Sequence, residues 1–525
     1  MVAIAQELSI SKVRSPSAAL VAVATIVALT VPLAYLLNIW QDEAYTLHTT
    51  AGGFAYAFHQ ALGFEQNAPL YFLLLTAWRH LGDSAFFLRL PSVFCIAGAL
   101  ALVPGLVRRY VPSADSGLVT WVAAWNPFTV WAAVEMRVYA LIVLLSAVLL
   151  LTFFDAFLAE QRSRLSTLAY AAFCIVALYT QYYFAFLLFA QGVAVVVYRR
   201  QSVWRFLICA AVAVAAFTPM LAIVPNQVAN FKGAFTPPSP LRANAVLAAI
   251  LARFLLPLFI AHAKAIYLAL AVCALGVAIA VRKQFAKGGD GTILVLTGCA
   301  FIAFAFGTYA LGVHLLDRHA AALYLPAQLA VFAVFSFLSP PLRRAATTAW
   351  AALALTASTV FLAHAYAPLA KQGDWVRVAS YLHEHEGPGQ PIAVFEAENA
   401  LPFSYYYHGA NRVVAVPAAV DFRRYDVTRF VLHSAGDVAR SLPEGSRFWL
   451  ITAGECASAN IRFGCDVLER FIGLHYRVER DAKFYGSRVR LLRPLDKAGG
   501  RLYGSTVPLQ FMVFQAGVAS LNEVG

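Results

Sequence analysis

The sequence predicts a mainly α-helical, polytopic membrane protein with a soluble α/β or α+β domain at its C-terminus. Three observations lead to this fold class. Of the 525 residues, 61% are hydrophobic and only 13% are charged, whereas soluble globular chains carry about 25% charged residues. Apolar runs of the length that crosses a bilayer, about 20 residues, recur as far as residue 367. From about residue 373 the apolar runs become short and charged turns separate them, which is typical of a soluble domain.

Eleven apolar runs are candidate membrane spans. No small-residue cleavage site ahead of a mature domain ends the first run, so we interpret it as an anchor helix and not as a removed signal peptide. Two shorter apolar segments, 68–81 and 243–261, are expected to lie at the outer membrane interface as amphipathic helices. The predicted spans are 18–38, 84–107, 117–134, 137–159, 165–181, 183–198, 203–223, 264–282, 291–311, 319–338 and 345–367.

The basic residues predict how these spans are oriented, because Lys and Arg are enriched in cytoplasmic loops. With the N-terminus in the cytoplasm, every basic cluster between spans falls on the inner face, provided that 68–81 and 243–261 do not cross. The C-terminus is then outside, in the periplasm of a bacterial inner membrane. The formal net charge of +13 is thereby explained without nucleic acid. The inner clusters are Lys12/Arg14, Arg108/Arg109, Arg162/Arg164, Arg199/Arg200/Arg205, Arg282/Lys283/Lys287 and Arg343/Arg344.

The change in composition divides the chain into a membrane domain, residues 1–368, and a soluble periplasmic domain, residues 369–525. The start of the soluble domain, residues 374–409, predicts helix, turn, strand, loop and helix in that order. Cys456 and Cys465 enclose a short loop there. An oxidising periplasm would allow them to form a disulfide, and two free thiols are the alternative.

The outer loops predicted by this topology contain the polar residues that a function would need. Charge at membrane depth is costly unless it faces water, a partner or a substrate. Residues from distant parts of the sequence therefore converge on one face, which predicts a site there. They are Asp42, Glu43 and Glu65 in loop 39–67, the turn with Glu135 and Arg137, residues 181–183, loop 224–240 and turn 314–319.

Several of these segments form ordered motifs. They are WQDEAYT (40–46), FEQNAPLYFLLLTAWRHLGDSAFFLRLPS (64–92), VEMRVYAL (134–141), LYTQYYFAFLLFAQ (178–191), LLDRHAAALYLP (315–326) and DWVRVASYL (374–382). In this order they resemble the GT-C superfamily of membrane glycosyltransferases, in particular the bacterial branch related to protein O-mannosyltransferases and to the aminoarabinose transferase of lipid A. The family often has Pro-Pro where this chain has Ala68-Pro69, His at Gln181, and Arg-Tyr at Arg318-His319.

The resemblance implies inverting transfer of a sugar from a polyprenyl-phosphate donor to a lipid, glycan or protein acceptor of the cell envelope. Such a transfer requires a carboxylate that takes the acceptor's proton and cations that stabilise the leaving phosphate. Asp42 aligns with the first-loop aspartate of the family and is the predicted general base. Glu43 would orient the acceptor or hold the local fold. The structural alternative is an acidic pair that caps a helix or pairs with arginine.

Arg137 and Arg318 are the candidate ligands of the donor phosphate, because a guanidinium offers a fork of donors. Arg137 could equally reach lipid headgroups or pair with Glu135. Helical spacing would place Glu135 and Tyr139 on one face, with Arg137 turned away. His319 is expected to be a local hydrogen-bond partner and not a metal ligand.

Glu65 lies where the lipid A transferase has an acidic residue followed by Lys, but here Gln66 follows it. Lys232 could supply that cation. Tyr182 is a candidate substrate contact, although aromatic residues are common at membrane interfaces. Glu65, Glu135, Tyr139, Tyr182 and His319 together form the predicted support for substrate binding.

Other site classes are not predicted. There is no Walker loop, GxGxxG, CxxC pair or zinc spacing, so we expect no nucleotide cofactor and no resident metal, although a divalent cation could assist the phosphate. The alternative function is a transporter or flippase of lipid-linked sugars. It would place ionisable residues near mid-span and often shows inverted repeats. The charges here cluster at one interface, which favours the enzyme.

Overall fold

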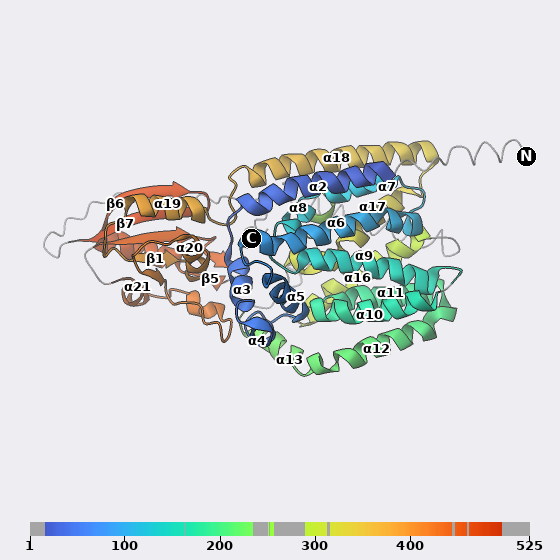
Figure 1. Cartoon of the computed structure of the whole chain (residues 1–525), viewed down its shortest axis with the longest axis horizontal. Coiled ribbons are helices and arrows are strands. Elements are labelled where there is room, and N and C mark those ends of the chain that lie inside the picture. Colours follow the sequence, from blue (N-terminus) through green and yellow to red (C-terminus); the bar gives the residue numbers. More distant parts are fainter. Residues whose placement is uncertain are drawn as a thin grey trace, which may run out of the picture. The chain divides into compact units, whose positions relative to one another are not determined.

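The computed structural model describes residues 16–161, 163–234, 250, 253–256, 289–311, 316–443, 447–458 and 461–495. Contacts along the chain divide it into two compact units (Figure 1). The first unit is Met1–Tyr35, Asn67–Asn226 and Pro238–His364, and the second is Leu36–Gln66, Gln227–Pro237 and Ala365–Gly525. The first loop therefore belongs to the same unit as the C-terminal domain. The predicted division into residues 1–368 and 369–525 places that loop with the membrane domain instead.

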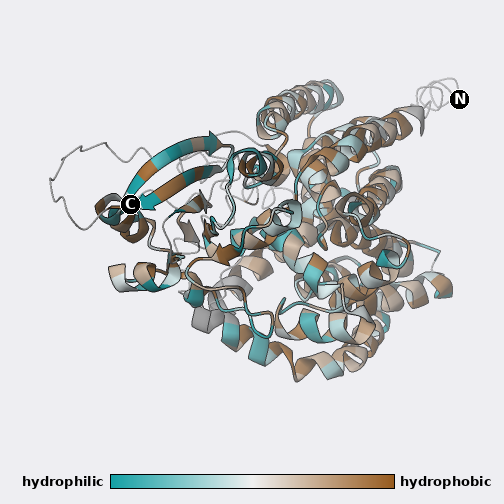
Figure 2. Ribbon diagram, turned by 60° about the vertical axis from the view of Figure 1, so that its left-hand side comes forward, coloured by the Kyte–Doolittle hydropathy of each residue, from teal (hydrophilic) through white to brown (hydrophobic). Residues whose placement is uncertain are grey.

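The first unit consists of apolar helices, and hydrophobic residues dominate their ribbons (Figure 2). Within the described residues, seven segments are long and apolar enough to cross a membrane: Ala18–Leu36, Ala85–Tyr110, Tyr139–Leu158, Arg200–Leu221, Asp290–Gly307, Asp317–Phe335 and Pro340–Tyr366. The predicted fold class is thereby confirmed. The helices are α2 (Pro16–Leu36), α5 (Leu70–Arg79), α6 (Ala85–Tyr110), α7 (Ser116–Ala124), α8 (Pro127–Ala133), α9 (Tyr139–Phe153), η1 (Phe154–Leu158), α10 (Arg164–Thr180), α11 (Phe184–Tyr198), η2 (Arg200–Ser202), α12 (Val203–Leu221), α16 (Gly289–Leu311), η3 (Asp317–Leu323), α17 (Tyr324–Phe335) and α18 (Pro340–Tyr366).

The predicted spans coincide with these helices except in two places. Span 117–134 is not one helix, because Asn126 caps a new helix, its side chain accepting from Phe128 N at 2.9 Å, and Pro127 occupies the first position of α8. Span 264–282 lies outside the described residues. Segment 68–81 forms only the ten-residue helix α5, which is too short to cross a bilayer.

The helices of the first unit differ in the fraction of their residues that is buried inside the protein. Of the span Asp317–Phe335, 67% is buried inside the protein, against 17% of Arg200–Leu221. Helix α12 accordingly exposes Trp204, Leu207 and Val214, which suits contact with lipid. The predicted phosphate ligands of this unit lie elsewhere: Arg137 in the bend before α9, and Arg318 on η3.

The second unit contains a five-stranded mixed sheet in the order β2-β1-β3-β7-β6. Strand β1 is parallel to β2 and β3, whereas β7 is antiparallel to β3 and β6, so the predicted α/β or α+β domain is present. Its elements are α19 (Trp375–His385), β1 (Ile392–Phe395), η4 (Ala397–Asn399), α20 (Ala400–Tyr406), β2 (Val413–Ala415), η5 (Val427–Phe430), α21 (Ala435–Ser441), β3 (Phe448–Ala453), β4 (Ala457–Ser458), β5 (Ile461–Arg462), α22 (Cys465–His475), β6 (Tyr476–Phe484) and β7 (Ser487–Pro494).

The sheet has a hydrophobic core on each face, because successive side chains of a strand point to opposite sides. In β1, Ala393 and Phe395 pack into one core with α21 and α22. Ile392 and Val394 pack into the other core with α19 and α20. Figure 2 shows hydrophobic and hydrophilic residues alternating along strands of this sheet. Cys456, which follows β3, forms a disulfide with Cys465, the first residue of α22.

Candidate functional site

Helix α3 (Gln41–Thr49) carries the predicted acidic pair and belongs to the second unit. Asp42 and Glu43 lie in its first turn, where the positive end of the helix dipole stabilises negative charge. The two carboxylates differ in exposure: Asp42 is partly exposed, whereas Glu43 is 0% exposed. Of the two, Asp42 is thus the carboxylate that a substrate could reach.

The Glu43 carboxylate forms an ion pair with a residue of the C-terminal part of the chain. Lys371 Nζ donates to Glu43 Oε2 at 3.2 Å, and both side chains are buried. The backbone of Lys371 is held in addition by Asn38, whose amide donates to Lys371 O and accepts from Lys371 N, each at 3.0 Å. Of the two roles that the sequence leaves open for Glu43, this environment favours holding the local fold.

A second carboxyl of the C-terminal domain contacts α3 at Tyr45. The Tyr45 hydroxyl donates to Glu398 Oε1, and Tyr425 donates to the same oxygen at 3.2 Å. Burial raises the pKa of Glu398 to about 7, against the effect of both tyrosine hydroxyls, and the negative charge of Asp42 adds to the rise. Burial and the neighbouring Glu398 raise the pKa of Tyr45 well above its usual value, so Tyr45 is the hydrogen-bond donor.

Further contacts join the first loop to the C-terminal domain. Tyr406 accepts from the backbone N–H of Ile39 at 2.8 Å, and the His48 ring stacks on Phe422 with ring centroids 3.4 Å apart. Gln41 Nε2 donates to Asn399 Oδ1 at 2.8 Å. Helix α3 is thus held along its whole length by side chains more than 300 residues away in sequence.

The second unit contains two further site candidates, Glu65 and Lys232. Glu65 follows α4 (Gly53–Gly63) and accepts a hydrogen bond from Thr49 at the end of α3, at 3.2 Å. Lys232 lies on α13 (Val224–Ala234). Gln227 of the same helix donates a hydrogen bond from Nε2 to the backbone oxygen of Leu62 at 2.8 Å. The second unit therefore gathers the acidic residues and the helix that carries Lys232.

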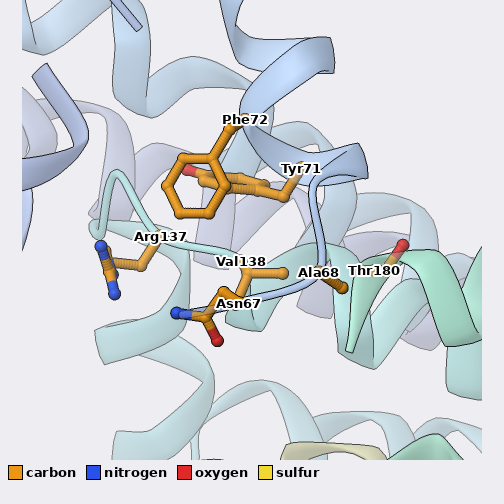
Figure 3. Close-up of a pocket in the computed structure, with 7 residues that line it drawn as sticks. All are labelled: Asn67, Ala68, Tyr71, Phe72, Arg137, Val138 and Thr180. Carbon is orange, nitrogen blue, oxygen red and sulfur yellow. The ribbon is translucent and has the colours of Figure 1, made fainter. Parts of the chain in front are cut away.

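In the first unit, Arg137 lines a pocket (Figure 3). Arg137 is 8% exposed and lies in the bend between α8 and α9. Figure 3 shows Asn67 reaching the pocket from the segment before α5 and Tyr71 and Phe72 from α5 itself. The lining of this pocket thus combines a guanidinium and an amide with aromatic walls. The pocket is lined by Asn67, Ala68, Tyr71, Phe72, Arg137, Val138 and Thr180.

The predicted helix face with Glu135 and Tyr139 is not formed. Helix α9 begins only at Tyr139, and Glu135 and Arg137 precede it in the bend. Ser92 Oγ donates to the backbone oxygen of Glu135 at 2.6 Å, which satisfies a carbonyl that a continuous helix would use for its own ladder. The Glu135 side chain is buried in this bend.

Arg318 and His319 lie on η3, beside a partly buried ion pair. Arg253 Nη1 donates to Asp317 Oδ2 at 2.5 Å, and the Arg318 backbone N–H donates to Asp317 Oδ1 at 2.7 Å. His319 Nδ1 accepts from Leu316 N at 3.0 Å, the local role that the sequence predicts.

Aromatic rings connect η3 to the bend that carries Arg137. The guanidinium of Arg253 lies 4.5 Å from the centroid of the Trp131 ring, and that ring lies 4.9 Å from the ring of Tyr139. Tyr183 lies 5.3 Å from the His319 ring, while Tyr182 packs against Phe217. These contacts link η3, through Arg253, to the residues on either side of the bend that carries Arg137.

Four residues that the sequence analysis does not single out contact the candidate site residues or the elements that carry them, or line the pocket with Arg137. Lys371 is the first charged residue after the last predicted span, and Asn67 lies inside one of the motifs. Both positions could therefore have been recognised from the sequence. Arg253 is the charge inside the apolar segment 243–261, which is itself a signal. Glu398 had none, because it looks like an ordinary surface charge until its partner is known.

One cluster of potential metal ligands occurs within the described ranges, formed by Glu396, Cys456 and Cys465. The two sulfurs are joined in the disulfide, so neither is a free thiolate. Glu396 accepts from Cys456 N at 2.7 Å, and burial raises the pKa of Glu396 to about 8. The cluster is therefore best explained as a structural contact beneath the disulfide.

No family model and no curated protein matches the sequence. Solved structures that match it over most of its length include two of ArnT. The crystal structure of ArnT from Cupriavidus metallidurans in the apo state is 13% identical, with a TM-score of 0.53, over 89% of this chain and 97% of that one. The crystal structure of the same protein bound to undecaprenyl phosphate is 14% identical, with a TM-score of 0.51, over 91% of this chain and 99% of that one.

The resemblance predicted from the motifs is confirmed at the level of the fold. This chain is a multi-span membrane protein with the fold of ArnT.

Proposed function

We propose that the protein is an inverting glycosyltransferase that moves a sugar from a polyprenyl-phosphate donor to a lipid, glycan or protein acceptor of the cell envelope. The observation that carries this proposal is the ArnT fold over about nine tenths of the chain, together with the binding of undecaprenyl phosphate by ArnT itself. The motifs that resemble the GT-C superfamily contain Asp42, Arg137 and Arg318, which have the chemistry that this reaction needs.

In the proposed reaction, Asp42 takes the proton of the acceptor hydroxyl. The acceptor oxygen forms a bond to the anomeric carbon from the face opposite the leaving group, while the bond from that carbon to the phosphate oxygen breaks. Polyprenyl phosphate leaves with the negative charge, which Arg137 and Arg318 stabilise. Lys232 is the third candidate for phosphate binding, and Glu65, Tyr139 and Tyr182 support the substrates.

Purified protein should release sugar from a polyprenyl-phosphate donor when extracted cell-envelope acceptors are present. A panel of donors with different hexoses and pentoses, assayed in detergent and in liposomes, tests the proposal and identifies the sugar. Movement of intact lipid-linked sugar across the liposome, without cleavage, would instead support a flippase. If none of the donors is consumed, the proposed function is wrong.

Arg137→Gln is expected to raise the KM for the donor about 10- to 100-fold, because it removes a charge-assisted hydrogen-bond donor to phosphate. The matched control is Arg109→Gln, which removes the bidentate pair of Arg109 with Asp155 at the end of α6. This control should leave the donor KM unchanged. Equal donor KM values for the two variants would rule out phosphate binding by Arg137.

We further propose that the site and the C-terminal domain face the periplasm. A cysteine at residue 290 should then resist a membrane-impermeant maleimide added to intact cells and react after permeabilisation. A cysteine near residue 235 should react in intact cells, because that loop is expected outside. The opposite pattern would reverse the proposed orientation.

A further inference from the structure

Two anchored side chains flank Asp42 on helix α3. Successive residues of an α-helix are rotated by about 100°, so Glu43 lies about 100° to one side of Asp42 and Tyr45 about 60° to the other. Glu43 is paired with Lys371, and Tyr45 donates to Glu398. Both Glu43 and Tyr45 are buried. The helix face with Asp42 is therefore held from both sides by the C-terminal domain.

The anchor at Tyr45 extends beyond one hydrogen bond. Glu398 Oε1 also accepts from Tyr425, and the Tyr45 and Tyr425 rings meet edge to face with centroids 6.1 Å apart. The Tyr45 ring makes a second edge contact with Phe422 at 6.4 Å. Such a network of buried polar and aromatic contacts restricts rotation of the helix more than any single contact does.

We propose that Glu398 and Lys371 are positioning residues of the active site, and that the C-terminal domain serves the transferase by fixing the helix turn that carries the base Asp42. This inference rests on the proposed function, since it assigns the domain a part in that reaction. A misplacement of about 1 Å can lower the rate of an enzyme about 100-fold, so a base on a short helix depends on such anchors.

Glu398→Ala is expected to lower kcat about 10- to 100-fold, with the donor KM within about twofold of the wild type, because the donor's phosphate ligands are untouched. Glu398→Gln should restore most of the rate, since its amide oxygen can accept from Tyr45 and Tyr425. Tyr45→Phe should reproduce the loss. Combined with Glu398→Ala it should add little, because both remove the same contact.

The domain offers a matched control. Tyr407 donates to Glu386 Oε2 at 2.5 Å, and Asn411 donates to the same oxygen at 2.8 Å. Glu386→Ala thus removes a tyrosine–carboxylate contact of the same kind, which lies within the C-terminal domain and involves no residue of α3. It should leave kcat unchanged, even where it lowers the unfolding midpoint.

Hydrogen exchange over residues 41–49 provides a readout that is independent of turnover. Exchange should become faster in Glu398→Ala and stay at the wild-type rate in Glu386→Ala. If exchange rises but kcat does not fall, or if kcat falls equally in both variants, the positioning role is wrong. If the wild type transfers no sugar at all, the proposed function fails. In that case, faster exchange in Glu398→Ala alone would still support anchoring of α3.

Discussion

Asp42→Asn is expected to reduce sugar transfer by about 100- to 10,000-fold, which is the contribution typical of a general base. The substitution keeps the size and shape of the side chain but removes its negative charge, and with it the ability to take the acceptor's proton. Helix α3 should persist, because its anchors Glu43 and Tyr45 are unchanged and Thr46 Oγ1 still donates to the backbone oxygen of residue 42, at 3.1 Å in the wild type. The measurement is release of sugar from the donor, with the acceptor saturating.

Two controls make this result specific to the carboxylate. The donor KM and the unfolding midpoint of Asp42→Asn should match those of the wild type, which separates loss of the base from loss of binding or fold. Glu43→Gln provides the neighbouring comparison: it should lower stability more than Asp42→Asn does and kcat less. Turnover by Asp42→Asn near the wild-type rate would exclude Asp42 as the base.

Lys371→Met is expected to destabilise the second unit by about 3–5 kcal/mol, the usual cost of removing one partner of a buried ion pair. The lost charge lies 3.2 Å from the Glu43 carboxylate, whose side chain is 0% exposed. For a unit of this size the loss corresponds to a fall of about 10 °C in the unfolding midpoint. Calorimetry in detergent, with exchange over α3 to locate the effect, provides the measurement.

The double variant Glu43→Gln with Lys371→Met is the decisive comparison. It removes both charges, so it should recover a large part of the stability that Lys371→Met loses. Lys371→Arg, which keeps the charge, should cost less than Lys371→Met. If Lys371→Met unfolds at the wild-type midpoint, the ion pair does not stabilise this unit.

The membrane part of the fold was predictable because its signal is local. Runs of apolar residues become helices whatever surrounds them, since the backbone in a bilayer must satisfy its own hydrogen bonds. Even the division of span 117–134 has a local signal, because Asn126 followed by Pro127 is a helix-start pattern. The bend at Glu135 had no such pattern, because it depends on Ser92, 43 residues earlier.

The candidate site divides in the same way. By itself, the sequence determined the membrane-spanning character, the C-terminal domain and the motif residues Asp42, Arg137 and Arg318, because composition and ordered motifs can be recognised without any contacts. Only the tertiary structure decided which polar side chains meet: Glu43 pairs with Lys371, 328 residues away, and Tyr45 donates to Glu398, 353 residues away. An ion pair leaves no periodicity in the sequence, since it forms wherever packing brings two distant side chains together and excludes water.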